Sequence, residues 1–122
     1  MNALRRACCL ALLAAMAGHA APSPSPAEQA RIDKLIAAVA QNKQARFIRN
    51  GSDYSAADAA DFLRRKLEAY GDRVKTVNDF IDQIGTKSST SGQLYKVRLG
   101  DGKEVPSAEF LRAELARIEA AH

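Results

Sequence analysis

The stretch that decides the fold of this 122-residue chain is Phe47-Ile48-Arg49-Asn50-Gly51-Ser52-Asp53-Tyr54. Its centre, Asn-Gly, is the residue pair that a two-residue type I′ turn prefers, because both turn positions need a positive φ. A two-residue loop also sets the register of the strands that it joins, so Phe47 should lie opposite Tyr54. We therefore predict a β-hairpin over residues 47–54.

A second hairpin is predicted closer to the carboxyl end. The segment Tyr95-Lys96-Val97-Arg98-Leu99 alternates apolar and basic side chains, which is typical of a strand buried on one face. Gly100-Asp101-Gly102 then supplies a three-residue loop. The register that results gives two cross-strand pairs, Val97 with Val105 and Arg98 with Glu104.

Four helices are predicted from capping residues and from apolar side chains at helical spacing. Three of them begin with a serine or threonine that is followed three residues later by an acidic residue. The first three predicted helices run from Ser25 to Asn42, from Ser55 to Gly71 and from Thr76 to Gly85. The last predicted helix is capped by Ser107 and continues toward the carboxyl end.

These elements predict a single small α+β domain, with about four helices packed on two β-hairpins that form one antiparallel sheet. Each hairpin is followed by a helix, and the segments 62–67 and 110–115 both begin Phe-Leu-Arg. The chain could therefore contain a duplicated β-β-α unit. The alternative is coincidence, because such a segment is ordinary helix composition.

The first 20 residues have the three parts of a secretory signal, with Arg5 and Arg6 ahead of an apolar run and small residues before Ala20. The apolar run, Ala7 to Ala17, holds 11 residues, fewer than the roughly 20 that a membrane-spanning helix needs. We therefore expect cleavage after about Ala20, export to the periplasm, and no integral membrane span in the mature chain.

Cleavage would leave a proline- and serine-rich linker at 21–26 and one domain at 27–122. The leader carries Cys8, Cys9 and His19, so the mature chain would keep only His122 as a histidine and no cysteine. Zinc sites, thiol nucleophiles, serine-histidine triads and disulfides are therefore not expected, and no cofactor is predicted.

The charge pattern argues against nucleic-acid binding. Loss of the two leader arginines lowers the formal net charge from +4 to +2. The remaining charges alternate in sign along the predicted helices, whereas a nucleic-acid binder concentrates basic residues on one stripe.

Four motifs are spread along the chain: Phe47-Ile48-Arg49-Asn50-Gly51 leading to Tyr54, Asp79-Phe80-Ile81-Asp82, Lys87-Ser88-Ser89-Thr90-Ser91-Gly92 with Tyr95, and Pro106-Ser107-Ala108-Glu109-Phe110-Leu111-Arg112. In combination they resemble the YfeK-like family of short exported bacterial proteins. The resemblance covers nearly all of the mature chain. It implies a Gram-negative periplasmic protein of unassigned function, and it transfers no catalytic residue.

The segment from Thr86 to Gly92 is hard to explain by packing, because it offers one lysine, five hydroxyl groups and a glycine. One interpretation is a solvated connection between a helix and a strand. The other is a cradle for an anionic envelope component or a protein partner, built from side-chain and turn donors. The candidate ligand-binding residues are Arg49, Asn50, Tyr54, Lys87, Ser88, Ser89, Ser91, Tyr95 and Arg98, with Lys96 as a further source of charge.

Two other functions stay open. A small hydrolase would use Ser88, Ser89 or Ser91 as nucleophile and Lys87 as base, although the Ser-x-x-Lys spacing of serine-lysine enzymes is absent. A structural or stress-related periplasmic role would need no site at all. Tyr54 and Tyr95 could present their rings to a ligand or fill the core, and filling the core is the more common role of such residues.

Overall fold

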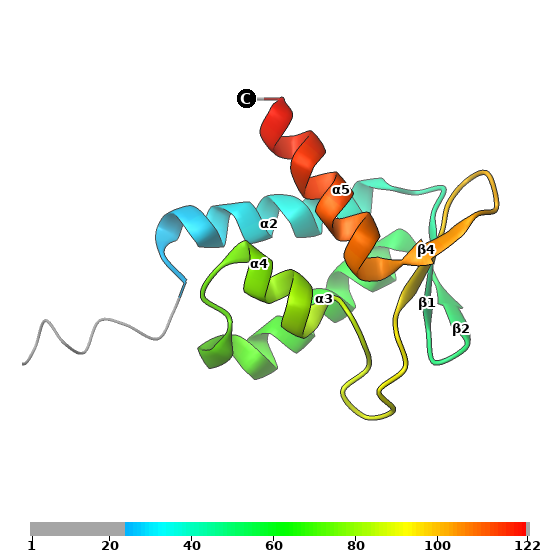
Figure 1. Cartoon of the computed structure of the whole chain (residues 1–122), viewed down its shortest axis with the longest axis horizontal. Coiled ribbons are helices and arrows are strands. Elements are labelled where there is room, and N and C mark those ends of the chain that lie inside the picture. The colour runs from blue at the N-terminus through cyan, green and yellow to red at the C-terminus, as the bar shows by residue number, and fades with distance from the viewer. Residues whose placement is uncertain (1–23, 122) are drawn as a thin grey trace, which may run out of the picture.

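The computed structural model describes residues 24–121, and the predicted leader lies outside that range. Figure 1 shows a group of helices beside a small sheet. The elements in chain order are α2 (Pro26–Gln41), β1 (Arg46–Arg49), β2 (Ser52–Tyr54), α3 (Ala56–Tyr70), the 3₁₀ turn η1 (Gly71–Arg73), α4 (Val77–Asp79), the π-helical turn η2 (Phe80–Ile84), β3 (Lys96–Arg98), β4 (Glu104–Pro106) and α5 (Ser107–Ala120). The predicted α+β class is confirmed.

Both hairpins form in the predicted registers. Phe47 pairs with Tyr54 in the first hairpin, and Asn50 and Gly51 have φ values of 51° and 83°, as a type I′ turn requires. The pairs of the second hairpin are Val97 with Val105 and Arg98 with Glu104.

The two hairpins lie side by side in one antiparallel sheet of order β2-β1-β3-β4. They join where β1 pairs with β3, with Phe47 opposite Val97. Because side chains alternate between the faces of a strand, the side chains of Phe47, Val97 and their partners all point to one face. The helices cover that face (Figure 1), which confirms the predicted arrangement.

Apolar packing between the helices and this sheet face forms the core. Helix α2 crosses it and contacts α3, α4 and α5. The largest fully buried side chains are Phe80, Ile32, Leu35, Ile36, Ile81, Ile84, Leu111, Val39, Val74, Val77 and Val97. Full burial of one such side chain stabilises a fold by about 1.5–3 kcal/mol, so this set supplies most of the driving force for folding.

The predicted caps at Ser25, Ser55 and Thr76 are present, since each side-chain oxygen accepts a hydrogen bond from the third helical backbone amide. At Ser25 the reciprocal bond of a capping box, from the backbone amide of Ser25 to the Glu28 carboxylate, is not formed. That carboxylate accepts a hydrogen bond from the Val77 amide at 2.8 Å and another from Arg31 at 2.9 Å. The Val77 bond, followed by the Arg31 bond, lowers the pKa of Glu28, and the carboxylate ties α2 to the start of α4.

The prediction that Ser107 caps the last helix is wrong. Pro106 occupies the cap position, and no side chain bonds to the first turn of α5 there. The Ser107 amide donates to the Tyr95 carbonyl at 2.9 Å, which extends the β3–β4 ladder by one residue. Because the helix begins directly from the strand, Ser107 is already its first residue and does not occupy the capping position.

The β-β-α order occurs twice, but the matching sequence segments are not equivalent in space. Helix α3 starts at Ala56 and α5 starts at Ser107. Phe62 therefore lies six residues after the first residue of α3, whereas Phe110 lies three residues after the first residue of α5. The repeat is one of architecture, and the shared Phe-Leu-Arg segments occupy different positions in their helices.

Candidate functional site

An open cleft of about 210 Å³ lies between the first hairpin, the start of β3 and helix α3. Four aromatic side chains contribute to its wall, namely Phe47, Tyr54, Phe62 and Tyr95. We call this feature the aromatic cleft. Apolar side chains of α3 and α5, the first residue of α5 and several charged residues also line it.

Arg49 is the cation most closely associated with the aromatic rings. The centre of its guanidinium lies 4.3 Å from the ring centroid of Phe62 and 5.3 Å from that of Tyr54. One guanidinium nitrogen also donates to the Tyr54 hydroxyl at 3.5 Å. Stacking on aromatic faces leaves the edge donors of a guanidinium available, so Arg49 can still bind an acidic group.

Lys66 lies behind Tyr95 and is almost completely buried, with 7% of its surface exposed. Its Nζ donates to the Tyr95 hydroxyl at 3.0 Å and to the Lys87 carbonyl at 2.8 Å. The ring of Phe62 packs edge-to-face on Tyr95, with the centroids 5.8 Å apart. Lys66 therefore fixes both a wall of the cleft and the base of the connection that follows Gly85.

Burial changes the ionisation of this pair. The pKa of Lys66 is lowered, first because burial removes water from the ammonium group and second because Arg49 carries a like charge. Burial also raises the pKa of Tyr95, and the positive charge of Arg49 opposes this rise. The tyrosine therefore stays a neutral hydroxyl at neutral pH.

Within residues 24–121, neither Arg49 nor Lys66 forms an ion pair. The charged residues that line the cleft are Arg49, Asp58, Asp61, Arg65 and Lys96. By strand alternation the Lys96 side chain belongs to the other face of the sheet. Arg49 and Arg65 then balance the two carboxylates, and the buried Lys66 ammonium behind the wall adds the remaining positive charge.

The serine-rich connection folds back on the tip of the first hairpin. The Ser88 hydroxyl accepts hydrogen bonds from the Asn50 side-chain amide at 3.4 Å and from the backbone amides of Thr90 and Ser91 at 3.3 Å each. The Ser91 hydroxyl donates to the Asn50 side-chain oxygen at 2.6 Å. These donors and acceptors bond to one another, so the connection is a docked loop.

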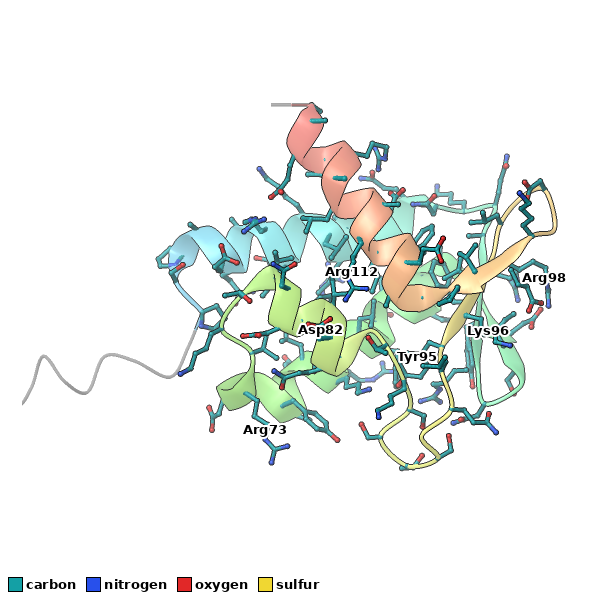
Figure 2. The ribbon with its side chains drawn as sticks, in the orientation of Figure 1. Arg73, Asp82, Tyr95, Lys96, Arg98 and Arg112 are labelled. Atoms are coloured by element: carbon teal, nitrogen blue, oxygen red, sulfur yellow. The ribbon has the colours of Figure 1, made fainter. Side chains whose placement is uncertain are left out.

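Arg98 lies away from the cleft. Figure 2 shows it on the side of the sheet that the helices do not cover, where it pairs with Asp53 at 2.9 Å and with Glu104 at 3.4 Å. These two carboxylates neutralise its charge.

The structure thus separates the predicted site residues into groups. Arg49, Tyr54 and Tyr95 meet at the cleft, and Asn50, Ser88 and Ser91 hold the docked loop. Lys87 contributes a backbone carbonyl to Lys66, Lys87 and Ser89 are exposed, and Arg98 faces the other way.

Sequence reasoning missed Phe62, Lys66 and Ser107. Phe62 and Lys66 both fall at the helical spacing of the apolar residues of α3, and a lysine at such a position was the available signal, since buried lysines are rare. Ser107 was missed because its pattern fits a helix cap.

Among the described residues, histidine, cysteine and carboxylate side chains form no group of three that could hold a metal ion. Across residues 24–121, no helix has the length and apolarity to cross a membrane.

Comparison with known proteins gives a family. Over 68 residues the chain is 38% identical to a Salmonella typhimurium protein named Uncharacterized protein YfeK. The alignment covers 56% of this chain and 57% of that relative, so it spans little more than half of each. No solved structure matches the chain significantly. Residues 26–119 match the model described as Family of unknown function (DUF5329), and the chain therefore belongs to this YfeK-like family.

Proposed function

We propose that the aromatic cleft binds a small amphipathic molecule that carries one acidic group. The observation behind this proposal is Arg49, whose guanidinium stacks on Phe62 at the cleft without a carboxylate partner in the described chain. A binding protein needs this combination of apolar wall and aimed charge, whereas a catalyst also needs a reactive group.

The proportions of the cleft set the size of the molecule. Its volume of about 210 Å³ is below the range of roughly 300–1,000 Å³ that holds drug-sized ligands. One ring or a short branched chain fits such a space. Its apolar atoms would gain about 25 cal/mol for each Å² removed from water, and the acidic group would receive charge-assisted hydrogen bonds from Arg49.

A titration followed by ¹H–¹⁵N NMR tests this function. The probes are 4-isopropylbenzoate and its uncharged analogue 4-isopropylbenzamide, which share one apolar body. We expect the benzoate to shift the amide signals of Arg49, Tyr54, Phe62 and Tyr95, and to bind about tenfold more tightly than the benzamide, because only it can form ionic hydrogen bonds.

Arg49→Gln should remove this preference for the acid. The matched control is Arg46→Gln, which removes the same charge from the same strand but on the exposed face. Shifts that spread over other surfaces, equal binding of both probes, or equal effects of the two variants would contradict the proposal.

We further propose that the protein works outside the cytoplasm, where the ligand would be an envelope component. The support is the sequence of the first 20 residues, with its arginine pair, apolar run and small residues before Ala20. Mass spectrometry of protein from a periplasmic fraction should find an amino terminus near Ala21, and an intact leader would contradict export.

The serine-lysine hydrolase gains no support from the geometry. In the described part of the chain, no hydrogen bond joins the Lys87 ammonium to Ser88, Ser89 or Ser91. The Ser88 hydroxyl instead accepts from loop amides, an arrangement that stabilises a turn and does not activate a nucleophile.

A further inference from the structure

A second polar group faces the cleft besides Arg49. Ser107 lines the cleft and is 93% buried, since only 7% of its surface is exposed. Its hydroxyl takes part in no hydrogen bond with the described residues. Every side-chain nitrogen or oxygen atom of those residues that is fully enclosed does have a partner, so the Ser107 hydroxyl is not one of the enclosed atoms. The hydroxyl is therefore accessible, and the cleft is the space that it can reach.

The sheet register fixes where Ser107 stands relative to Arg49. Ile48 pairs with Lys96, and Lys96 pairs with Pro106. One residue further along each strand, Arg49, Tyr95 and Ser107 form a single row on the helix-covered face, and the bond from the Ser107 amide to the Tyr95 carbonyl continues this pairing. Two strand spacings separate the outer members, about 10 Å between their backbones.

We infer that the ligand of the cleft carries, besides its acidic group, an uncharged hydrogen-bond acceptor at the opposite end, which Ser107 binds. This inference rests on the proposed binding function and names the chemical class of the ligand. Arg49 would hold the acid, Ser107 would donate to a carbonyl-like oxygen, and the ring or chain between them would lie against Tyr95 and Phe62.

The position of Ser107 explains why the second group accepts a hydrogen bond and has no charge. Ser107 is the first residue of α5, and the cap residue Pro106 supplies no side-chain partner for the first turn. A helix amino terminus favours partial negative charge. Glu109 already places a full negative charge in that turn, so a second anion would be repelled while a neutral carbonyl oxygen would not.

Two probes of nearly equal shape test the inference by the same NMR titration. The first is 4-acetylbenzoate, and the second is 4-isopropylbenzoate, which keeps the acid but lacks the acceptor oxygen. We expect the acetyl compound to bind about threefold to tenfold more tightly, as one added neutral hydrogen bond allows.

Ser107→Ala should abolish this preference, and Ser107→Thr, which keeps the hydroxyl, should retain it. Ser52→Ala is the matched control, because Ser52 is an exposed serine beyond Arg49 in the same cross-strand row. The ¹H–¹⁵N spectrum of each free variant reports whether its fold is intact.

If both probes bind equally to the unchanged protein, or if the preference survives in Ser107→Ala, the second contact is wrong while the binding function stands. If neither probe binds, the proposed function fails, and this inference fails with it.

Discussion

Gly85 shows at the scale of one residue how packing can determine a sequence position. It was predicted to close a helix, and η2 does end there. Its φ of −93° is open to any residue, so a left-handed cap is not the reason for glycine. A Cβ atom at this position would collide with Cδ1 of the buried Leu111. Glycine is thus needed because α5 packs directly on this backbone.

Gly85→Ala should lower the free energy of unfolding by about 1–3 kcal/mol, because the added methyl group overpacks the contact with Leu111. Gly71 is the matched control, since its backbone is helical and a Cβ there meets no atom within 4 Å. Gly71→Ala should be neutral or stabilise by up to about 1 kcal/mol. Urea unfolding of both variants gives the comparison, and equal losses would refute the packing explanation.

The docked loop between η2 and β3 is the feature that matters most at the scale of elements. Asn50 has two roles there, because its backbone makes the hairpin turn and its side chain bonds to Ser88 and Ser91. Asn50→Gly separates these roles, since glycine accepts a positive φ but has no amide group.

In Asn50→Gly we expect the hairpin to persist while the amides of Ser91 and Gly92 exchange with solvent about tenfold faster. The reason is that the loop loses its side-chain bonds to the hairpin. Hydrogen exchange measured by NMR checks this, with Asp101→Gly in the other hairpin loop as control. Unchanged exchange in the loop would mean that the Asn50 contacts do not hold it.

The elements also differ in how far their own sequence determines their structure. The Asn-Gly turn, the glycine loop and the caps at Ser25, Ser55 and Thr76 were predictable because each depends on neighbours within a few residues. The π-helical form of η2 and the direct step from β4 into α5 were not, because contacts with distant parts of the chain produce them. The cleft could not be predicted for the same reason. Helical periodicity identifies Phe62 as an apolar position but does not show that it lines a cleft.

Buried Lys66 affects the stability of the whole molecule. Because its pKa in the folded state lies below the usual 10.5, the unfolded chain binds more protons between the two values. The free energy of unfolding therefore increases as pH rises from the folded-state pKa of Lys66 to 10.5. Below the folded-state pKa the buried ammonium lowers the stability by a constant amount. Tyr95, whose pKa is raised, acts in the opposite sense only above about pH 10.

We expect the stability of Lys66→Met to rise less than that of the unchanged protein as pH rises toward 10.5, because the contribution of the lysine is absent. Methionine keeps the length of the side chain but has no proton to release. Urea unfolding at several pH values measures the difference, and Lys43→Met, at an exposed lysine, controls for the loss of one charge. A parallel pH dependence in Lys66→Met and the unchanged protein would show that Lys66 keeps an ordinary pKa when folded.

The two β-β-α halves differ at a position that borders the aromatic cleft. Counting from the first residues of α3 and α5, Ala59 and Phe110 occupy corresponding places. Phe110 packs edge-to-face on Phe47 of the first hairpin, whereas the small Ala59 lines the aromatic cleft. A small side chain where its counterpart is large leaves space for a bound molecule.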